Sequence, residues 1–319
     1  IKQPQLDYYD MGDGVVAFSS QRHGGYSQGN YAAFNINRYC GDSAEAIRCN
    51  REALCRILGI SDDRLLMPHQ VHQTKVVQID EPFMALTSAA TQQALEGVDA
   101  LMTNLGGVCI GVSTADCIPV LLYDSSHGAV CAIHAGWRGT VARIVMKAIE
   151  AMVVAYGTRP QQLTAQIGPG IHLESFEVGE EVYDAFVQEG FDMPAISVRK
   201  DSKWHIDLPE CNRRQLMACG LSSERISVSP ICTFIQCADY FSARRLGISS
   251  GRIFTGIMLR MGRGRFVHPG FPLTCANLEM VETFAVDADD GALRDEGLGV
   301  DVVDDAEDDV ALSSLGQHE

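Results

Sequence analysis

The sequence has no excess of basic residues. Its 319 residues include 25 Lys and Arg against 41 Asp and Glu, which gives a formal net charge of −16. A nucleic-acid-binding face needs clustered positive charge, so this balance argues against nucleic acid as a partner. The acidic residues are also unevenly distributed along the chain: residues 260–319 alone hold 14 acidic and 4 basic residues.

Long apolar runs are missing as well. No stretch approaches the length that crosses a bilayer, and the start shows no basic segment followed by the apolar stretch of a signal peptide. The 11 cysteines lie scattered from Cys40 to Cys275, without the density of a small disulfide-stapled domain. We therefore expect a soluble, cytoplasmic protein with mostly reduced thiols and no membrane partner.

What is present is a mixture of helical and strand-like segments. A helix is predicted at 44–58, capped by Asp42 and ended by Gly59, and another at 141–156 between Thr140 and Gly157. Because helices interleave with strands joined by short turns, we expect a layered α/β domain with a mixed sheet. Further helices are predicted near 179–189 and 209–219, and strand-like runs at 75–79, 100–103, 108–112, 119–123, 129–133 and within 226–258.

The composition changes near residue 260. Residues 260–319 begin with a Gly- and Arg-rich stretch and continue as an acidic segment with little large apolar content. Such a segment cannot bury enough surface to offset the entropy of ordering it. We expect 1–259 to be a single catalytic domain and 260–319 to be an acidic, disordered tail.

Three short clusters place metal-ligand or nucleophile side chains at the ends of predicted strands, where active sites gather. One interpretation joins His72, Cys117 and His134 around a single catalytic metal with a fourth position left open. Asp116 could then carry a proton or anchor a ligand, and Arg138 could hold an anionic group. The clusters are residues 69–72 (HQVH), 113–119 (STADCIP) and 133–139 (IHAGWRG).

The same residues permit other interpretations. A His beside a strand is often a hydrogen-bonded structural residue, and a Cys between apolar strands often belongs to the core. Cys117 could instead be a thiolate nucleophile with His134 as its base. The spacings of 45 and 17 residues between His72, Cys117 and His134 match no local zinc motif, and His69 is a weaker candidate ligand. From the residues alone these alternatives stay open.

At these clusters the sequence resembles the YfiH-like family. Its members have been described as laccase-domain proteins or multicopper polyphenol oxidases, and also as purine nucleoside phosphorylases with adenosine deaminase activity. The resemblance covers about residues 10–259, and residues 39–42 (YCGD) depart from the family's His-Val-Gly-Asp-like stretch. It rests on residues 20–27 (SQRHGGYS), 70–72 (QVH), 114–120 (TADCIPV), 134–139 (HAGWRG) and 167–170 (IGPG).

The resemblance implies a layered α/β/β/α sandwich and makes His72, Cys117 and His134 the metal ligands. The metal is expected to be Zn²⁺, with Cu²⁺ as the alternative. The expected reaction is phosphorolysis of purine nucleosides (adenosine, inosine, methylthioadenosine), with deamination of adenosine as a second activity. The candidate catalytic residues are Asp116, Cys117 and Arg138, and the candidate substrate-binding residues are Arg22, Gly25, Arg138 and Arg244.

Other functions stay open beside this one. A laccase-type oxidase would act on phenols with O₂, and a thiolate with two imidazoles also suits copper. The nine histidines, however, include no His-x-His pair, which is few for a trinuclear copper cluster. A third alternative is a thiol hydrolase that uses Cys117 with His134, or a scaffold without catalysis. For each enzyme the partner is a small-molecule substrate, and we expect a monomer or a small homo-oligomer.

Overall fold

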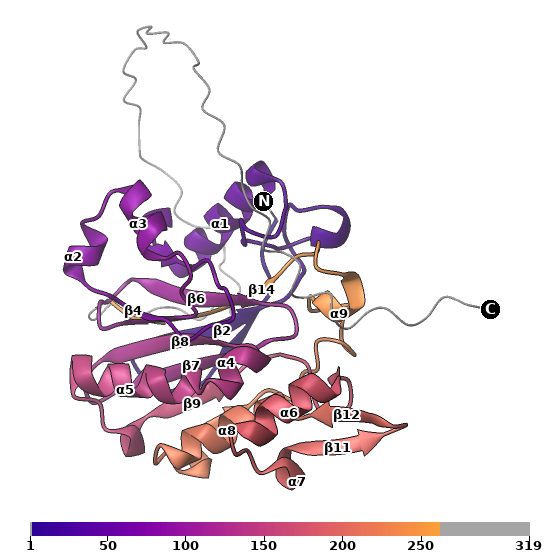
Figure 1. Ribbon diagram of the computed structural model, residues 1–319. Coiled ribbons are helices and arrows are strands. Elements are labelled where there is room, and N and C mark those ends of the chain that lie inside the picture. Colours follow the sequence, from indigo (N-terminus) through magenta and orange to yellow (C-terminus); the bar gives the residue numbers. More distant parts are fainter. Residues whose placement is uncertain (1, 262–319) are drawn as a thin grey trace, which may run out of the picture. The chain divides into compact units, whose positions relative to one another are not determined.

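A computed structural model describes residues 2–261, which form two β-sheets stacked face to face with helices on their outer sides (Figure 1). The predicted layered α/β fold with mixed sheets is confirmed. The predicted tail, residues 260–319, lies outside the described residues except for its first two positions.

The larger sheet has six strands and carries the candidate site. Its four inner strands pair antiparallel, whereas the strand at each edge pairs in parallel with its neighbour. The two central strands are buried along their whole lengths, as expected where both faces are covered. In spatial order the strands are β13 (Ile226–Val228), β9 (Thr164–Ile167), β7 (Ile118–Asp124), β8 (Ala129–Ala135), β5 (Ala100–Thr103) and β4 (Val76–Ile79).

The second sheet has five strands and is also mixed, because only its last pair is parallel. Its order is β1 (Leu6–Tyr9), β2 (Val15–Ser20), β14 (Ile253–Leu259), β6 (Cys109–Thr114) and β3 (Leu65–Leu66). A third, small antiparallel sheet consists of β10 (Glu177–Val178), β12 (Lys203–Ile206) and β11 (Ser197–Lys200).

Three apolar layers hold these elements together. Leu121 and Val130 of the larger sheet meet Ile110 and Ile257 of the second sheet in the layer between them. A second layer joins the outer face of the larger sheet to helices α5 (Ile144–Tyr156) and α8 (Leu208–Ala218). A third places helix α1 (Ala44–Leu58) on the second sheet. Burying each large apolar side chain stabilises the fold by about 1.5–3 kcal/mol, so these layers fix the sandwich.

The predicted helices are confirmed, with corrections at two starts. Ser43, not Asp42, caps α1, because its hydroxyl accepts from the Ala46 N–H. Thr140 does not cap the helix predicted at 141–156. Instead α4 (Trp137–Val141) begins directly after Gly136, and α5 begins after Arg143, whose φ of 63° interrupts the chain of helical hydrogen bonds. Thr140 therefore lies inside α4 and is fully buried.

The remaining helices are short. The strand-like segments expected within 226–258 are confirmed as β13 and β14, and between them Ser242 caps a helical turn by accepting from the Arg245 N–H. These helices are α2 (Glu81–Met84), α3 (Ser88–Ala94), α6 (Glu180–Gln188), α7 (Met193–Ile196) and α9 (Ala243–Leu246), with 3₁₀ turns at Gly29–Tyr31, Asp62–Arg64, Pro160–Gln162 and Ser223–Arg225.

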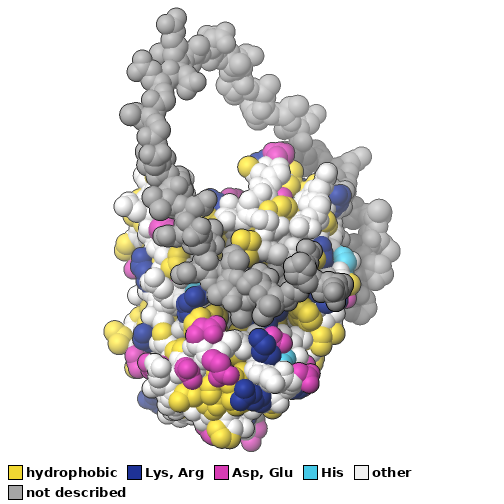
Figure 2. All heavy atoms as spheres, turned by 45° about the vertical axis from the view of Figure 1, so that its right-hand side comes forward, with side chains coloured by type: hydrophobic (Ala, Val, Ile, Leu, Met, Phe, Trp, Pro, Cys, Tyr) yellow, Lys and Arg dark blue, Asp and Glu magenta, His cyan; other side chains and the backbone are white. Residues whose placement is uncertain are grey.

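The surface and the thiols of the described residues bear on the partners expected above. On the face drawn in Figure 2, Lys and Arg side chains lie singly among Asp and Glu side chains. Within residues 2–261, no helix is long and apolar enough to span a bilayer. The ten cysteines of this part of the chain are all free thiols.

Candidate metal centre

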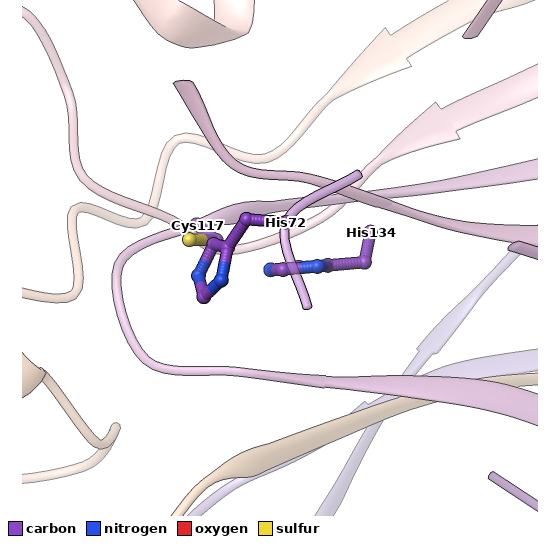
Figure 3. Close-up of side chains that lie close together, drawn as sticks. All are labelled: His72, Cys117 and His134. Carbon is purple, nitrogen blue, oxygen red and sulfur yellow. The ribbon is translucent and has the colours of Figure 1, made fainter. Parts of the chain in front are cut away.

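His72, Cys117 and His134 lie together in space. Their ligand atoms are all within 4.8 Å of one another, and the centroids of the two imidazole rings are 4.9 Å apart with an angle of 67° between the ring planes. Figure 3 shows the sulfur and both rings turned toward one another. Of the described residues, this is the one group of three such side chains close enough to hold a metal ion.

Strand pairing accounts for the convergence. In the antiparallel pair of β7 and β8, Pro119 lies opposite His134 and Ile118 opposite Ala135. Cys117, which directly precedes β7, is thereby brought beside the end of β8. His72 reaches the same point from the loop before β4, where its backbone has the left-handed φ of 60°.

Gly136 packs directly against this group. A Cβ at this position would lie 2.9 Å from Cδ2 of His72 and 3.1 Å from Sγ of Cys117. Real side chains do not tolerate such short contacts without shifting their neighbours, so only glycine fits. The glycine of the His-Ala-Gly-Trp-Arg-Gly segment thus allows the three donor side chains to meet.

The electrostatics of the group favour a thiolate. Burial alone would raise the pKa of Cys117, but His134 and His72 outweigh it and hold that pKa well below its ordinary value. Burial would likewise lower the pKa of His134, whereas the Cys117 sulfur and Asp99 together raise it. A deprotonated sulfur is the form that binds metals and attacks electrophiles.

Asp99 is a member of this site that the sequence did not reveal. Its carboxylate is fully buried, and its Oδ1 accepts from Nδ1 of His134 at 2.8 Å and from the backbone N–H of His72 at 3.0 Å. The only trace of it in the sequence is an acidic residue directly before an apolar strand. Such a residue is easily taken for a strand end at the surface.

Asp116 connects the Cys117 turn to Thr233 and to the first turn of α9. Its backbone has a φ of 90°, and its two carboxylate oxygens accept from the hydroxyl of Thr233 at 2.7 Å and from the backbone N–H of Arg244 at 2.8 Å. Both oxygens therefore hold the chain around Cys117 in place. A proton-transfer role for Asp116 stays a prediction.

Arg138 is the least constrained of the predicted substrate contacts. It is half-buried in the first turn of α4, and its guanidinium lies 4.5 Å from the ring centroid of Trp137. Within the described residues its side chain forms no hydrogen bond or ion pair. It follows Gly136 by two residues in the sequence, so its backbone is close to the residue that packs against the three donors.

Arg22, Gly25 and Arg244 have structural contacts of their own. Arg22 donates to the carbonyls of Ala32 at 2.9 Å and Cys237 at 2.7 Å, and Arg244 donates to the carbonyl of Glu177 at 2.7 Å. Neither arginine forms a salt bridge within residues 2–261, but the charges of Asp116 and Glu177 act on Arg244 and partly oppose the lowering of its pKa by burial.

Gly25 has a simpler explanation than substrate contact. A Cβ there would stand 2.1 Å from the carbonyl oxygen of Ala33. The glycine thus permits a close approach of two backbone segments. His69, the weaker candidate ligand, lies elsewhere: its Nδ1 is 2.5 Å from Glu96 and its ring stacks on Tyr39.

Comparison with known proteins assigns the family. Residues 16–260 match the model of the family described as multi-copper polyphenol oxidoreductase laccase. The chain belongs to this family. The matched segment contains all three donors, so the candidate metal centre lies within the part of the chain that defines the laccase-domain family.

Individual members of the laccase-domain family carry other names. The chain is 50% identical over 247 residues to a purine nucleoside phosphorylase of Bacteroides thetaiotaomicron, covering 77% of this chain and 92% of that protein. It is 44% identical over 259 residues to adenosine deaminase RL5 of an unknown prokaryotic organism, covering 81% and 98%. The crystal structure of Bacillus licheniformis YfiH aligns with a TM-score of 0.72 at 26% identity, covering 77% of this chain and 93% of that one. The predicted likeness to the YfiH family is confirmed.

Proposed function

We propose that this protein is a metal-dependent purine nucleoside phosphorylase that also deaminates adenosine, with the metal held by His72, Cys117 and His134. The observation that carries the proposal is the convergence of two imidazoles and a thiolate of lowered pKa within 4.8 Å of one another. The names of two relatives, at 50% and 44% identity, supply the reaction class.

The donor set fits zinc. Two neutral imidazoles and one thiolate are common zinc ligands, and three protein ligands leave a fourth position for a substrate or water. Because Gly136 has no Cβ, nothing at that position presses on the sulfur of Cys117 or the ring of His72. Zinc held by His72, Cys117 and His134 would act as a Lewis acid and would acidify a water molecule bound to it.

Phosphorolysis requires that an anion be held beside the nucleoside. An oxygen of phosphate bonds to C1′ of the ribose while the C1′–N9 bond breaks, and the purine leaves with the electron pair and takes up a proton. Arg138 suits the phosphate, because its half-buried guanidinium has no carboxylate partner within residues 2–261. Arg22 and Arg244 are further candidates, since each is partly buried and the hydrogen-bond partners of its side chain are neutral carbonyls.

Deamination uses the same site without phosphate. Water adds to C6 of adenine and the amino group leaves as ammonia, giving inosine. The protein's part is to orient the purine and to exclude other nucleophiles. In this proposal Asp116 and Cys117 remain catalytic candidates, with Asp116 acting through the Cys117 turn that it holds.

The test separates the two reactions. Zinc-loaded protein is incubated with adenosine and with inosine, each with and without phosphate, and the products are identified by chromatography. Adenine and ribose 1-phosphate that require phosphate, and inosine that does not, are expected. Cys117→Ala should lose zinc and both activities together, whereas Cys219→Ala, which removes another half-buried thiol, should keep them. Activity retained by zinc-free Cys117→Ala would overturn the mechanism.

A second candidate is copper-dependent oxidation of phenols by O₂. The family's description favours it, and a thiolate with two imidazoles also suits copper. Copper-loaded protein would then show a thiolate-to-copper absorption band and would consume O₂ with a phenolic substrate. Nucleoside turnover by the zinc form together with no O₂ uptake by the copper form would exclude it.

A third candidate is a thiol hydrolase. The lowered pKa of Cys117 and the adjacent His134 favour a thiolate nucleophile with an imidazole as proton carrier. A thiol hydrolase would turn over its substrate without bound metal, and alkylation of Cys117 would abolish that activity. Zinc would then inhibit instead of activating.

We also propose a cytoplasmic location with small molecules as partners. The ten free thiols of the described residues suit a reducing compartment. Cell fractionation with an antibody against the protein tests this, and recovery outside the cytoplasm would contradict it.

A further inference from the structure

One buried carboxylate receives four N–H groups from the site. Oδ1 of Asp99 accepts from the backbone N–H of His72 at 3.0 Å and from Nδ1 of His134 at 2.8 Å. Its Oδ2 accepts from the backbone N–H groups of Gln73 at 2.9 Å and Val71 at 3.4 Å. The side chain is fully buried, so no water competes for these bonds.

Asp99 positions both histidines, His134 through its ring and His72 through its backbone. The ring of His134 is held through its Nδ1, which leaves Nε2 as the nitrogen available to the cluster. His72 is held through its backbone, whose left-handed φ of 60° is otherwise unfavourable for a residue with a side chain. The converging N–H groups of residues 71–73 thus offset the strain that points the His72 ring at Cys117.

Only an ionised carboxylate suits this position. Every group that faces Asp99 is a donor, and a carboxylate is acceptor-only at both oxygens. An asparagine would bring an NH₂ group against either the Gln73 N–H or Nδ1 of His134. In the second case the ring would be driven to the tautomer that carries its proton on Nε2, the nitrogen needed by the cluster.

We propose that Asp99 is the positioning residue of the metal centre: it sets the orientation and tautomer of the His134 ring and the backbone conformation that presents His72. The proposal rests on the proposed metal site but not on the identity of the substrate. A carboxylate behind a ligating imidazole typically changes metal affinity by about 10- to 100-fold.

The chain offers a matched control. Asp124, at the far end of β7, is also fully buried, and it accepts from the Ser126 N–H and from the N–H and ring Nδ1 of His127. It lies seven residues beyond Cys117, or roughly 23 Å along an extended strand. Asp124→Asn therefore removes the same kind of interaction without touching the cluster.

The experiment measures zinc affinity by competition with a chelating dye, alongside thermal unfolding of the zinc-free proteins. Both Asp99→Asn and Asp124→Asn should lower the unfolding temperature. Asp99→Asn should weaken zinc binding about 10- to 100-fold, while Asp124→Asn stays within about twofold of the parent protein. Equal zinc affinities for the two variants, or an Asp99→Asn protein that binds zinc as tightly as the parent, would overturn the proposal.

A second measurement does not require the variant to fold. In zinc-loaded parent protein, ¹⁵N spectra of the histidine rings should show His134 with a protonated Nδ1 and a metal-bound Nε2. Binding of zinc through Nδ1 would contradict the role of Asp99. Since neither readout involves turnover, a lack of nucleoside activity would refute the proposed function while leaving this inference standing.

Discussion

A methyl group on Gly136 would stand 3.1 Å from the sulfur of Cys117. The two residues are 19 positions apart in the sequence, and they meet because Cys117 precedes β7 while Gly136 follows β8, its antiparallel neighbour. The same methyl group would lie 2.9 Å from Cδ2 of His72. Any side chain at position 136 would therefore press on two candidate ligands at once.

Gly136→Ala should push the His72 ring and the Cys117 sulfur out of place, and should therefore weaken zinc binding and lower nucleoside turnover by tenfold or more. A loss of about 1.4 kcal/mol in binding free energy is enough for a tenfold change in affinity. Zinc affinity and steady-state rates measure this. Gly106→Ala is the control, since a Cβ there would have only ordinary contacts, the nearest at 3.4 Å. Equal zinc affinity in the two variants would contradict the packing argument.

Alkylation of Cys117 in metal-free protein should have an unusual pH dependence. His134 and His72 outweigh the effect of burial and lower the pKa of Cys117 to about 6, so its thiolate fraction, and with it the iodoacetamide rate, should rise through pH 6 and level off above it. Burial raises the pKa of Cys219, which should react only at much higher pH. Mass spectrometry of the modified peptides distinguishes the two thiols.

Added zinc should protect Cys117 from alkylation. Cys117→Ala should abolish the alkylation that the parent protein shows at neutral pH. A rate for Cys117 that keeps rising toward pH 9, as for an ordinary thiol, would show that the imidazoles do not stabilise its thiolate.

Arg138→Gln should separate the two proposed reactions. Loss of a charge-assisted hydrogen bond to phosphate costs about 1.5–3 kcal/mol, so the KM for phosphate in phosphorolysis should rise about 10- to 100-fold. Deamination of adenosine, which uses no phosphate, should change far less. Arg48→Gln, which removes an exposed arginine paired with Glu45 and Glu52, should alter neither. Equal losses in both reactions of Arg138→Gln would place Arg138 on the nucleoside instead.

Two buried threonines next to the site should differ in how much stability they lose when replaced by valine. The hydroxyl of Thr233 donates to Asp116 at 2.7 Å, and removing it leaves a carboxylate oxygen without that donor, so Thr233→Val should lose about 1–3 kcal/mol of stability. The hydroxyl of Thr114 has no partner among the described residues, so Thr114→Val should be neutral or slightly stabilising.

Urea unfolding of the zinc-free proteins measures both effects. A similar loss in both variants would mean that Thr233 contributes only through packing. A loss of zinc affinity in Thr233→Val alone would further support the role of Asp116 in holding the Cys117 turn.

Local sequence signals predicted most of the elements. Apolar runs marked the central strands, because strands covered on both faces need unbroken apolar side chains. Glycines such as Gly59 and Gly157 marked helix ends correctly, since each adopts the left-handed conformation there. The start of the helix predicted at 141 was misplaced, because Thr140 resembles a cap but its hydroxyl is bonded to Asn212 in the core.

By itself, the sequence determined the layered fold and most of its strands, because apolar periodicity is a local property, and its resemblance to the laccase-domain family singled out His72, Cys117 and His134 as candidate ligands. Only the tertiary structure decided that these donors converge, since separations of 45 and 17 residues carry no information about distance. It also decided the role of Asp99, which precedes an ordinary-looking strand and receives its donors from residues 71–73 and from β8. Hydrogen bonds between distant segments depend on strand register, and the register is fixed only when the sheets pack.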